Sequence, residues 1–154
     1  MKFVADKMLG RLARWLRIIG QDVAYGPHLC GYGLIRAARS EGWLILTRDR
    51  SIVKKNPPEY LLIESDHFRD QLRQVIETFR LDPFKDAFTR CVECNTVLQS
   101  VAKEKVAGKV PPYVYSTQEK FSICQKCSRI YWQATHLERM RQELEAMGFQ
   151  APRI

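Results

Sequence analysis

The sequence predicts an α/β fold with a mainly parallel sheet in three layers, followed by a small cysteine-rich β module and a C-terminal helix. Two observations predict it. In the first 80 residues, short apolar runs alternate with segments of helical periodicity, which is the pattern of βα units with right-handed crossovers. From Thr89 onward, paired cysteines and short alternating stretches replace this pattern. We therefore expect one unit over residues 1–80 and a second over residues 89–154.

Four strands are expected in the first unit, because each is a short apolar run bounded by turn residues. Their predicted ranges are 2–5, 22–25, 43–47 and 60–64. Three helices are expected between and after them, because apolar residues recur there at helical spacing. Their predicted ranges are 8–19, 34–41 and 67–79, and Gly20 and Gly42 are expected to end the first two.

The second unit is expected to be a β module without a large apolar core. The alternating residues of YVYST, from Tyr113 to Thr117, predict a strand. Apolar residues share one helical face after that module, so a C-terminal helix is expected from about His136 until Gly148. Residues 81–88 are the expected connector between the units.

Charge and hydropathy limit the classes of partner. The 154 residues carry a formal net charge of +8, and such an excess of Lys and Arg attracts polyanions, nucleic acid first among them. The alternative is a merely solvated basic surface. No apolar run approaches the roughly 18 residues that cross a bilayer, and the N-terminus lacks the pattern of a signal peptide. We therefore expect a cytoplasmic protein that does not bind membranes.

Four of the five cysteines form two C-x-x-C pairs, Cys91 with Cys94 and Cys124 with Cys127. Two thiolates in one tight turn can bind the same ion, and a second such turn completes the tetrahedral shell that zinc prefers. A redox dithiol is the alternative for a single pair, but two pairs in a module without a core indicate a structural metal. With all four positions filled by sulfur, no open position remains for catalysis. Cys30 is interpreted as a small buried residue.

Three aspartates follow predicted strands of the parallel sheet, where ligands of such sheets collect. Asp6 ends the first strand, Asp49 follows the third, and Asp66 lies just past the fourth. Together they could hold Mg²⁺ or Mn²⁺, which prefer oxygen ligands and could activate water for attack on a phosphodiester. The alternative is that each is a helix N-cap or a solvated loop residue.

Basic residues lie close to these acids. Three of them recur on one face of the first predicted helix, and cations beside a carboxylate cluster suit a phosphate backbone. The alternative is an ordinary solvated helix face. The predicted nucleic-acid-binding residues are Lys7, Arg11, Arg14, Arg17 and Arg48. The cysteine module also mixes cations with aromatic residues, among them Arg129, Tyr131 and Trp132, which suits unstacked bases or else forms a miniature core.

Several segments resemble the Mut7-C family, PIN-like ribonuclease domains with an attached zinc ribbon. They are FVADKMLGRLARWLRIIGQDV, EGWLILTRDR, RCVECN, CQKC, and IYWQATH with the last helix, so the resemblance covers nearly the whole chain. It implies a PIN-like fold and divalent-metal-dependent cleavage of RNA. It also implies that Asp6 and Asp49 are among the metal-binding acids and that the four cysteines bind zinc.

The sequence departs from the family pattern just before the second helix. Acidic residues in a stretch resembling DDELI are usual there, whereas this chain has CGYGLI, from Cys30 to Ile35, and no acid between Asp22 and Glu41. Three hypotheses follow. In the first, the protein is an endonucleolytic ribonuclease, and Glu41 or Asp66 can be recruited to the metal. In the second, it is a catalytically weakened or inactive RNA-binding module of a ribonucleoprotein. In the third, it is an adaptor whose last helix binds a protein partner.

Overall fold

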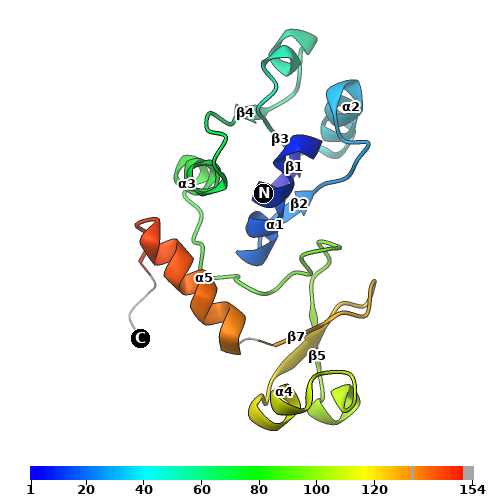
Figure 1. Ribbon diagram of the computed structural model, residues 1–154. Coiled ribbons are helices and arrows are strands. Elements are labelled where there is room, and N and C mark those ends of the chain that lie inside the picture. Colours follow the sequence, from blue (N-terminus) through cyan, green and yellow to red (C-terminus); the bar gives the residue numbers. More distant parts are fainter. Residues whose placement is uncertain (133, 151–154) are drawn as a thin grey trace.

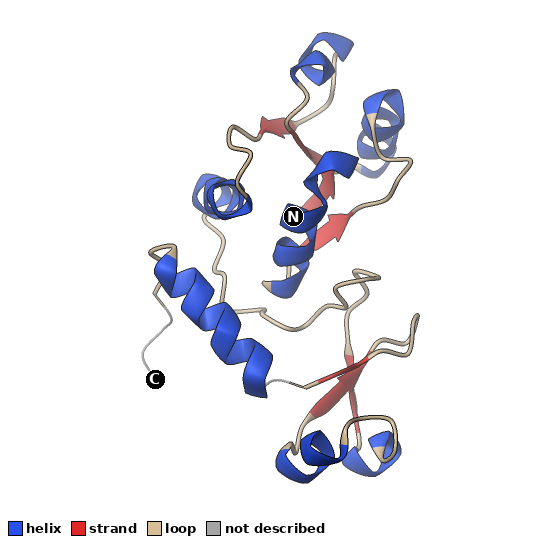
Figure 2. Ribbon diagram, in the orientation of Figure 1, coloured by secondary structure: helices blue, strands red, loops and turns tan. Residues whose placement is uncertain are grey.

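The structure is a computed structural model that describes residues 1–132 and 134–150. A parallel sheet with its helices lies at one end of the molecule, and a smaller antiparallel sheet lies at the other (Figures 1 and 2). The strands are β1 (Lys2–Ala5), β2 (Asp22–Ala24), β3 (Leu44–Thr47), β4 (Tyr60–Leu62), β5 (Gln99–Val101), β6 (Phe121–Ile123) and β7 (Ile130–Tyr131). The α-helices are α1 (Gly10–Ile18), α2 (Gly31–Glu41), α3 (Phe68–Phe79), α4 (Pro112–Thr117) and α5 (Ala134–Ala146). Three short 3-10 helices cover Lys7–Leu9, Arg50–Lys55 and Lys103–Val106.

The first sheet has the order β2-β1-β3-β4, and all of its neighbouring strands pair in parallel. The predicted α/β class is therefore confirmed, with β1 and β3 as the central strands. The chain returns from each strand to the next through a helical segment, as parallel pairing requires. The carboxyl ends of β1 and β3 consequently lie side by side.

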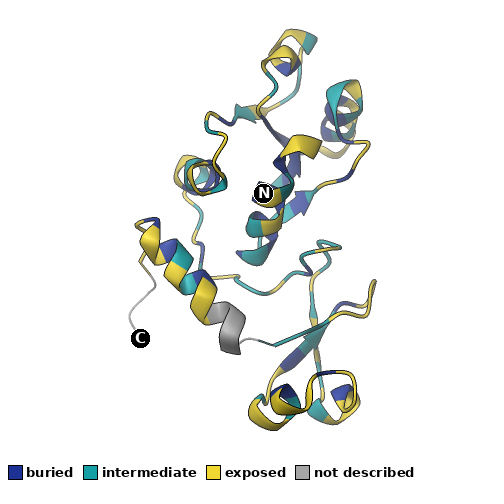
Figure 3. Cartoon of the chain, in the orientation of Figure 1, coloured by how far each residue is buried: buried dark blue, intermediate teal, exposed yellow. Residues whose placement is uncertain are grey.

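Alternate residues of the central strands face two separate cores. In β1, Phe3 and Ala5 join the larger apolar cluster, whereas Val4 joins the smaller one. Leu46 and Ile45 of β3 divide in the same way. Helices α1 and α3 cover the larger cluster and α2 covers the smaller, which produces the three predicted layers. Buried residues concentrate on these strands (Figure 3).

Glycines end the first two helices at the predicted positions. Gly42 has φ 71° and its N–H donates to the carbonyl of Ala38, a left-handed helix end that glycine adopts without strain. Gly20 has φ 90°, and a β-carbon there would collide with the backbone of Asp86 in the connector. Gly20 is thus required both by its φ angle and by the close approach of residues 81–88.

The cysteine module contains the antiparallel sheet β5-β6-β7 and a small core of its own. The prediction of a strand at Tyr113–Thr117 is wrong, because these residues belong mainly to the helix α4. Pro112 stands at the start of this helix, where its fixed φ and missing N–H cost nothing. Val114 is the buried residue of α4, and it completes the core with Val106, Val110 and Phe121.

Helix α5 packs on the parallel unit. Its Met140 and Leu144, with Met147 just after it, belong to the larger apolar cluster that contains Phe3 and Leu12. The last helix therefore covers the core of residues 1–80 although it follows the cysteine module in sequence. The division of the chain at residues 80 and 89 stays a prediction. Among the described helices, none combines the length and the apolarity that a bilayer crossing needs.

Candidate functional site

Asp6 lies at the carboxyl edge of the parallel sheet, buried next to Thr47. The register that pairs Ala5 with Leu46 brings these two residues together, and the N–H of Asp6 donates to the carbonyl of Leu46 at 2.9 Å. The Thr47 hydroxyl donates to Oδ2 of Asp6 at 2.7 Å. The second oxygen, Oδ1, is buried and has no hydrogen-bond partner among the described residues. An unsatisfied buried carboxylate oxygen is costly, and a cation would satisfy it.

Asp49 is connected to Asp6 through the same threonine. Its backbone N–H donates to Oγ1 of Thr47 at 3.0 Å, so one hydroxyl joins both aspartates. Oδ1 of Asp49 accepts hydrogen bonds from Oγ and N of Ser51, at 2.7 and 2.9 Å. These bonds favour the ionised carboxylate and hold the pKa of Asp49 below its usual value. The donor set at this edge therefore contains two oxygens of the type that Mg²⁺ and Mn²⁺ accept.

The third predicted acid, Asp66, lies apart. Its side chain is 74% exposed and its nearest charged partner is Nε2 of the neighbouring His67, at 3.8 Å. Within the described ranges, the four cysteines are the one set of three or more metal-ligating residues whose ligand atoms all lie within 4.8 Å of one another. The structure therefore brings Asp6 and Asp49 into one hydrogen-bond network and leaves Asp66 outside it.

The segment that departs from the family pattern lies beside this edge. Lys7 N donates to the carbonyl of Leu29, which holds the start of α2 next to Asp6. Nζ of Lys55 lies 5.5 Å from the ring centroid of Tyr32 and 3.2 Å from Oγ of Ser51, the residue bonded to Asp49. An ammonium group thus approaches the acids from the side of Cys30–Gly33, where the family pattern has carboxylates.

Two of the predicted RNA-binding arginines have partners inside the protein. Arg17 is 7% exposed, and it donates to the carbonyls of Val23, Val92 and Glu93 at 2.8 to 3.2 Å. Burial lowers the pKa of Arg17, although nearby acids and thiols oppose this shift. Arg14 is exposed and pairs with the Glu93 carboxylate at 3.0 Å. Arg17 therefore connects the two units of the molecule.

The other predicted basic residues are exposed. The guanidinium of Arg11 lies 3.8 Å from the ring centroid of Phe68, which leaves its outer side open to solvent. Lys7 and Arg48 are exposed next to Asp6 and Asp49 in the sequence, and their side-chain nitrogens have no ion-pair partner among residues 1–132 and 134–150. Lys7 and Arg48 thus adjoin the two acids in the sequence, and Arg11 follows in the first turn of α1.

The four cysteine sulfurs lie close together at the other end of the molecule. Sγ of Cys91 is 3.7 Å from Sγ of Cys127, which matches the roughly 3.8 Å expected between sulfurs that each lie about 2.3 Å from one tetrahedral zinc ion. Cys91 and Cys124 are fully buried. The hydroxyl of Tyr131 accepts from Val92 N and lies 3.1 Å from Sγ of Cys91. The four cysteines could therefore bind a metal such as zinc.

The two cysteine loops have the same backbone conformation. Asn95 N donates to the carbonyl of Cys91, and Ser128 N donates to the carbonyl of Cys124, both at 2.8 Å. Asn95 and Ser128 have φ angles of 64° and 65°. Each first cysteine also donates its N–H to the carbonyl five residues later. The doubled sequence motif thus folds into a doubled structure that points four thiols at one place.

The pKa values of the cysteine thiols indicate that this site favours a bound cation. Burial, together with the neighbouring thiols, raises the pKa of Cys94 to about 12. Burial also opposes ionisation of Cys124, but backbone N–H groups of Cys127 and Lys126 outweigh it and lower the pKa of Cys124 to about 7. Four thiolates are therefore not stable together here without a positive ion, which is what a thiolate-binding metal supplies.

The first cysteine loop is bonded to the parallel unit. Oδ1 of Asn95 accepts from Val23 N at 3.1 Å, and Nδ2 of Asn95 donates to Asp22 at 2.7 Å. Arg90 donates to the carbonyls of Gly20 and Asn95 at 3.3 and 2.9 Å. These hydrogen bonds join the cysteine loop to β2 and to the end of α1.

Sequence reasoning missed Thr47 and Ser51, and it did not predict the contact of Tyr131 with Cys91. Thr47 is the last residue of a buried strand and is 0% exposed, so a threonine there needs an internal partner. Ser51 follows Asp49 by two residues, the spacing at which an aspartate side chain caps a turn. No local signal marks the contact of Tyr131 with Cys91, because the two residues are 40 positions apart.

Comparison with known proteins identifies the chain. No curated protein and no solved structure matches the sequence significantly. A family model, described as the Mut7-C RNAse domain, matches residues 1–144. This range includes the acidic edge, both cysteine pairs and most of α5, and the family description indicates a ribonuclease-related function. The chain therefore belongs to the Mut7-C RNAse domain family.

Proposed function

We propose that the protein is a divalent-metal-dependent ribonuclease that cleaves RNA internally, with Asp6 and Asp49 as ligands of Mg²⁺ or Mn²⁺. The observation that carries the proposal is the buried Oδ1 of Asp6, which has no hydrogen-bond partner among the described residues. Thr47 engages Oδ2 and leaves Oδ1 available. A bound dication would stabilise negative charge on the phosphodiester and lower the pKa of a water molecule.

The chain's own residues have distinct tasks in this proposal. The hydroxyl of Thr47 orients Asp6, and the hydrogen bonds from Ser51 orient Asp49 and lower its pKa. Lys7, Arg11 and Arg48 are exposed cations around the edge and would bind phosphates on either side of the scissile bond. Asp66 is left out because its side chain is mostly solvated, and Arg17 is left out because its donors are already used.

We further propose that the cysteines hold one structural zinc ion. Four sulfur ligands leave no open position, so the ion would stabilise the fold and take no part in the reaction. Through the contacts of Asn95 and Arg90 with Val23 and Gly20, the ion would also stabilise the position of β2. Free thiols at this site suit a reducing compartment, and a cytoplasmic location is part of the proposal.

Cleavage assays with isosteric variants test the function. We expect Mn²⁺-dependent cleavage of RNA by the native protein, and loss of cleavage in Asp6→Asn and Asp49→Asn, because each amide keeps the shape but removes the charge. Asp66→Asn is the control and should cleave like the native protein. Equal cleavage by native protein and Asp6→Asn would remove this assignment.

A second function, binding of RNA without cleavage, is favoured by one observation. Tyr32 lies in the segment where the resemblance places acids, and the ammonium of Lys55 lies 5.5 Å from its ring, which reduces the negative charge available to hold a dication. In that case RNA binding would be salt-dependent and insensitive to added Mn²⁺, with no turnover. Lys55→Glu separates the two functions, because restored acidity should increase Mn²⁺-dependent cleavage only if the edge is a metal site.

A further inference from the structure

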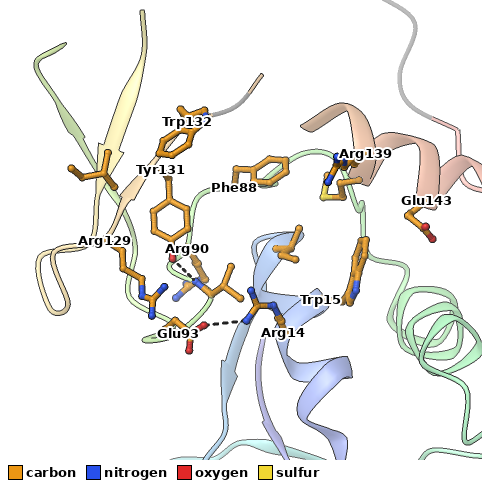
Figure 4. A pocket seen from close by; sticks show the side chains of 14 residues that line it. Arg14, Trp15, Phe88, Arg90, Glu93, Arg129, Tyr131, Trp132, Arg139 and Glu143 are labelled. Carbon is orange, nitrogen blue, oxygen red and sulfur yellow. Dashed lines mark hydrogen bonds and ion pairs between the residues drawn. The ribbon is translucent and has the colours of Figure 1, made fainter. Parts of the chain in front are cut away.

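A cavity of about 560 Å³ lies between α1, β7 and α5, at the junction of the two units (Figure 4). Its volume falls within the roughly 300–1,000 Å³ of typical ligand sites. The acidic edge is not part of it, because Asp6, Thr47 and Asp49 do not line it. The cavity is therefore a separate feature of the molecule, and the proposed chemistry does not use it.

Aromatic rings form much of the cavity wall. Trp15 comes from α1, Phe88 from the connector, and Tyr131 and Trp132 from the end of the cysteine module (Figure 4). Trp15 is held in place by stacking on Phe68, with ring centroids 5.8 Å apart and an interplanar angle of 27°. Flat rings on opposite sides of a cavity suit a planar ligand that stacks between or against them.

The charges around the cavity favour an anion. Its two glutamates are already paired, Glu93 with Arg14 at 3.0 Å and Glu143 with Arg69 at 2.7 Å. Arg129 and Arg139 are exposed and line the cavity, and their guanidinium groups have no hydrogen bond or ion pair with any described residue. Two available guanidinium groups beside aromatic rings match the chemistry of a nucleotide, which combines a flat base with a phosphate.

Basic residues connect the cavity with the acidic edge. Arg14 lines the cavity from α1, and Arg11 of α1 and Lys7 of the preceding 3-10 helix lie between Arg14 and Asp6 in the sequence. Arg14 follows Asp6 by eight residues, and this stretch, which is part 3-10 helix and part α-helix, spans roughly 12–16 Å at about 1.5 to 2.0 Å per residue. A strand of RNA with one base in the cavity could thus run along α1 with its phosphates on these cations.

We propose that this cavity binds an unpaired nucleotide of the RNA, stacking its base on the aromatic wall and holding its phosphate on Arg129 and Arg139. The inference rests on the proposed function, because it takes RNA as the substrate, and it defines the substrate class as RNA with a single-stranded segment beside the cleavage site. A base in a duplex is stacked on its neighbours and cannot enter the cavity.

The test measures binding of a fluorescein-labelled eight-nucleotide oligouridylate to the full-length zinc-loaded protein, without added Mg²⁺ or Mn²⁺. Arg129→Ala/Arg139→Ala should weaken binding by about tenfold or more, and Trp15→Leu by about fivefold or more, because stacking and phosphate contacts are lost. Lys126→Ala/Arg141→Ala is the matched control. It removes the same charge from the same two regions outside the cavity and should change binding less than about twofold.

A blunt RNA duplex of equal charge supplies the second arm. Its affinity should respond equally to the cavity variant and to the control, because only charge is lost in both. The proposal is overturned if the cavity variant binds oligouridylate like the control variant, if duplex and single strand lose the same affinity, or if the native protein binds no oligouridylate. An acidic peptide that binds the cavity while oligouridylate does not would assign the surface to a protein partner instead.

Mn²⁺-dependent cleavage distinguishes failure of this inference from failure of the proposed function. Cleavage that depends on Asp49 but is unchanged in the cavity variants would overturn the cavity proposal alone. Oligouridylate binding that depends on the cavity, with no cleavage by any protein, would overturn the nuclease proposal alone. If both hold, the cavity variants should raise KM and leave kcat unchanged, because they lie away from the reacting phosphate.

Discussion

The two candidate metal sites of this molecule assemble in different ways. The cysteine site is built from two four-residue loops with the same backbone conformation, so each loop carries half of the ligands by itself. The acidic edge takes single residues from two strands, and the register of β1 with β3 brings Asp6 next to Thr47 and Asp49. A site made of local loops is visible in the sequence, whereas a site made by register needs the fold first.

The two sites also differ in what balances their polar groups. At the acidic edge, the hydroxyls of Thr47 and Ser51 and the backbone N–H of Ser51 donate to the carboxylates, and Oδ1 of Asp6 has no partner among the described residues. In the cysteine module, the polar contacts of the thiols are mainly with one another and with the hydroxyl of Tyr131. We therefore expect loss of metal to unfold the cysteine module but to leave the parallel sheet's acidic edge intact in shape.

The largest effect is expected from removal of one cysteine. Cys124→Ser should abolish zinc binding and unfold the cysteine module, because zinc binding contributes about 10 kcal/mol or more to such folds. Cys30→Ser is the matched control, since Cys30 lies outside the cluster. Zinc content and thermal unfolding measure both. An unchanged melting temperature in Cys124→Ser would show that the module does not need its metal.

The second largest loss of stability is expected where Arg17 joins β2 to the first cysteine loop. Arg17→Met leaves the buried carbonyl of Val23 and the partly buried carbonyls of Val92 and Glu93 without a donor and should lower the free energy of unfolding by about 3 kcal/mol. Arg14→Met removes an exposed ion pair on the same helix and should cost less than about 1 kcal/mol. Urea denaturation compares the two. Similar losses would mean that Arg17 does not join the units.

Removal of the Thr47 hydroxyl tests the acidic edge itself. Thr47→Val keeps the shape but leaves Oδ2 of Asp6 and the N–H of Asp49 without their shared partner, at a cost of about 2 kcal/mol in unfolding free energy. Mn²⁺-dependent cleavage should fall as well, because Asp6 loses its orientation. Ser51→Val, at an exposed position, is not expected to lower stability as much. A stable, fully active Thr47→Val would break the proposed network.

Ser51 tests the charge on Asp49 through pH. The pKa of Asp49 is depressed in the folded protein, so its contribution to stability is present above the unfolded pKa and is lost as pH falls through the folded pKa. Ser51→Ala removes the hydroxyl donor and should raise this pKa toward the ordinary value. The acid limb of the cleavage profile should then move to higher pH, and NMR titration of the carboxyl carbon should move with it. An unmoved carboxyl titration would contradict the assigned cause.

The smallest effect is expected where the two cysteine loops differ. Asn95 and Ser128 occupy equivalent left-handed positions, which asparagine tolerates better than serine. Ser128→Gly should therefore stabilise the protein by up to about 1 kcal/mol, whereas Ser116→Gly, within α4, should destabilise it. Thermal unfolding at saturating zinc measures both. A destabilised Ser128→Gly would mean that the two loops are not equivalent.

Local patterns in the sequence predicted most of the fold. The alternation of apolar runs and helical segments located β1 to β4 and α1 to α3, and glycines located two helix ends. The strand predicted at Tyr113–Thr117 was wrong because five alternating residues are too few to separate a strand from a short helix. Pro112 directly precedes this segment, and a proline in the first turn of a helix was the missed signal.

Long-range contacts account for the rest of what the sequence did not reveal. Arg17 belongs by spacing to an exposed basic stripe, but its guanidinium is buried because the cysteine loop, some 75 residues later, supplies its acceptors. The packing of α5 on Phe3 and Leu12 likewise depends on where the cysteine module directs the chain. Asp66 follows a strand as predicted, but it lies in a solvated loop that does not turn toward Asp6.

Anomalous diffraction from crystals soaked in Mn²⁺ tests the central claim most directly. If Asp6 and Asp49 share a dication, one anomalous peak should lie within coordination distance of Oδ1 of Asp6 and of the Asp49 carboxylate, and it should be absent from Asp6→Asn crystals. The account would be contradicted if both side chains have clear density and no anomalous peak lies between them, at a Mn²⁺ concentration that labels other sites.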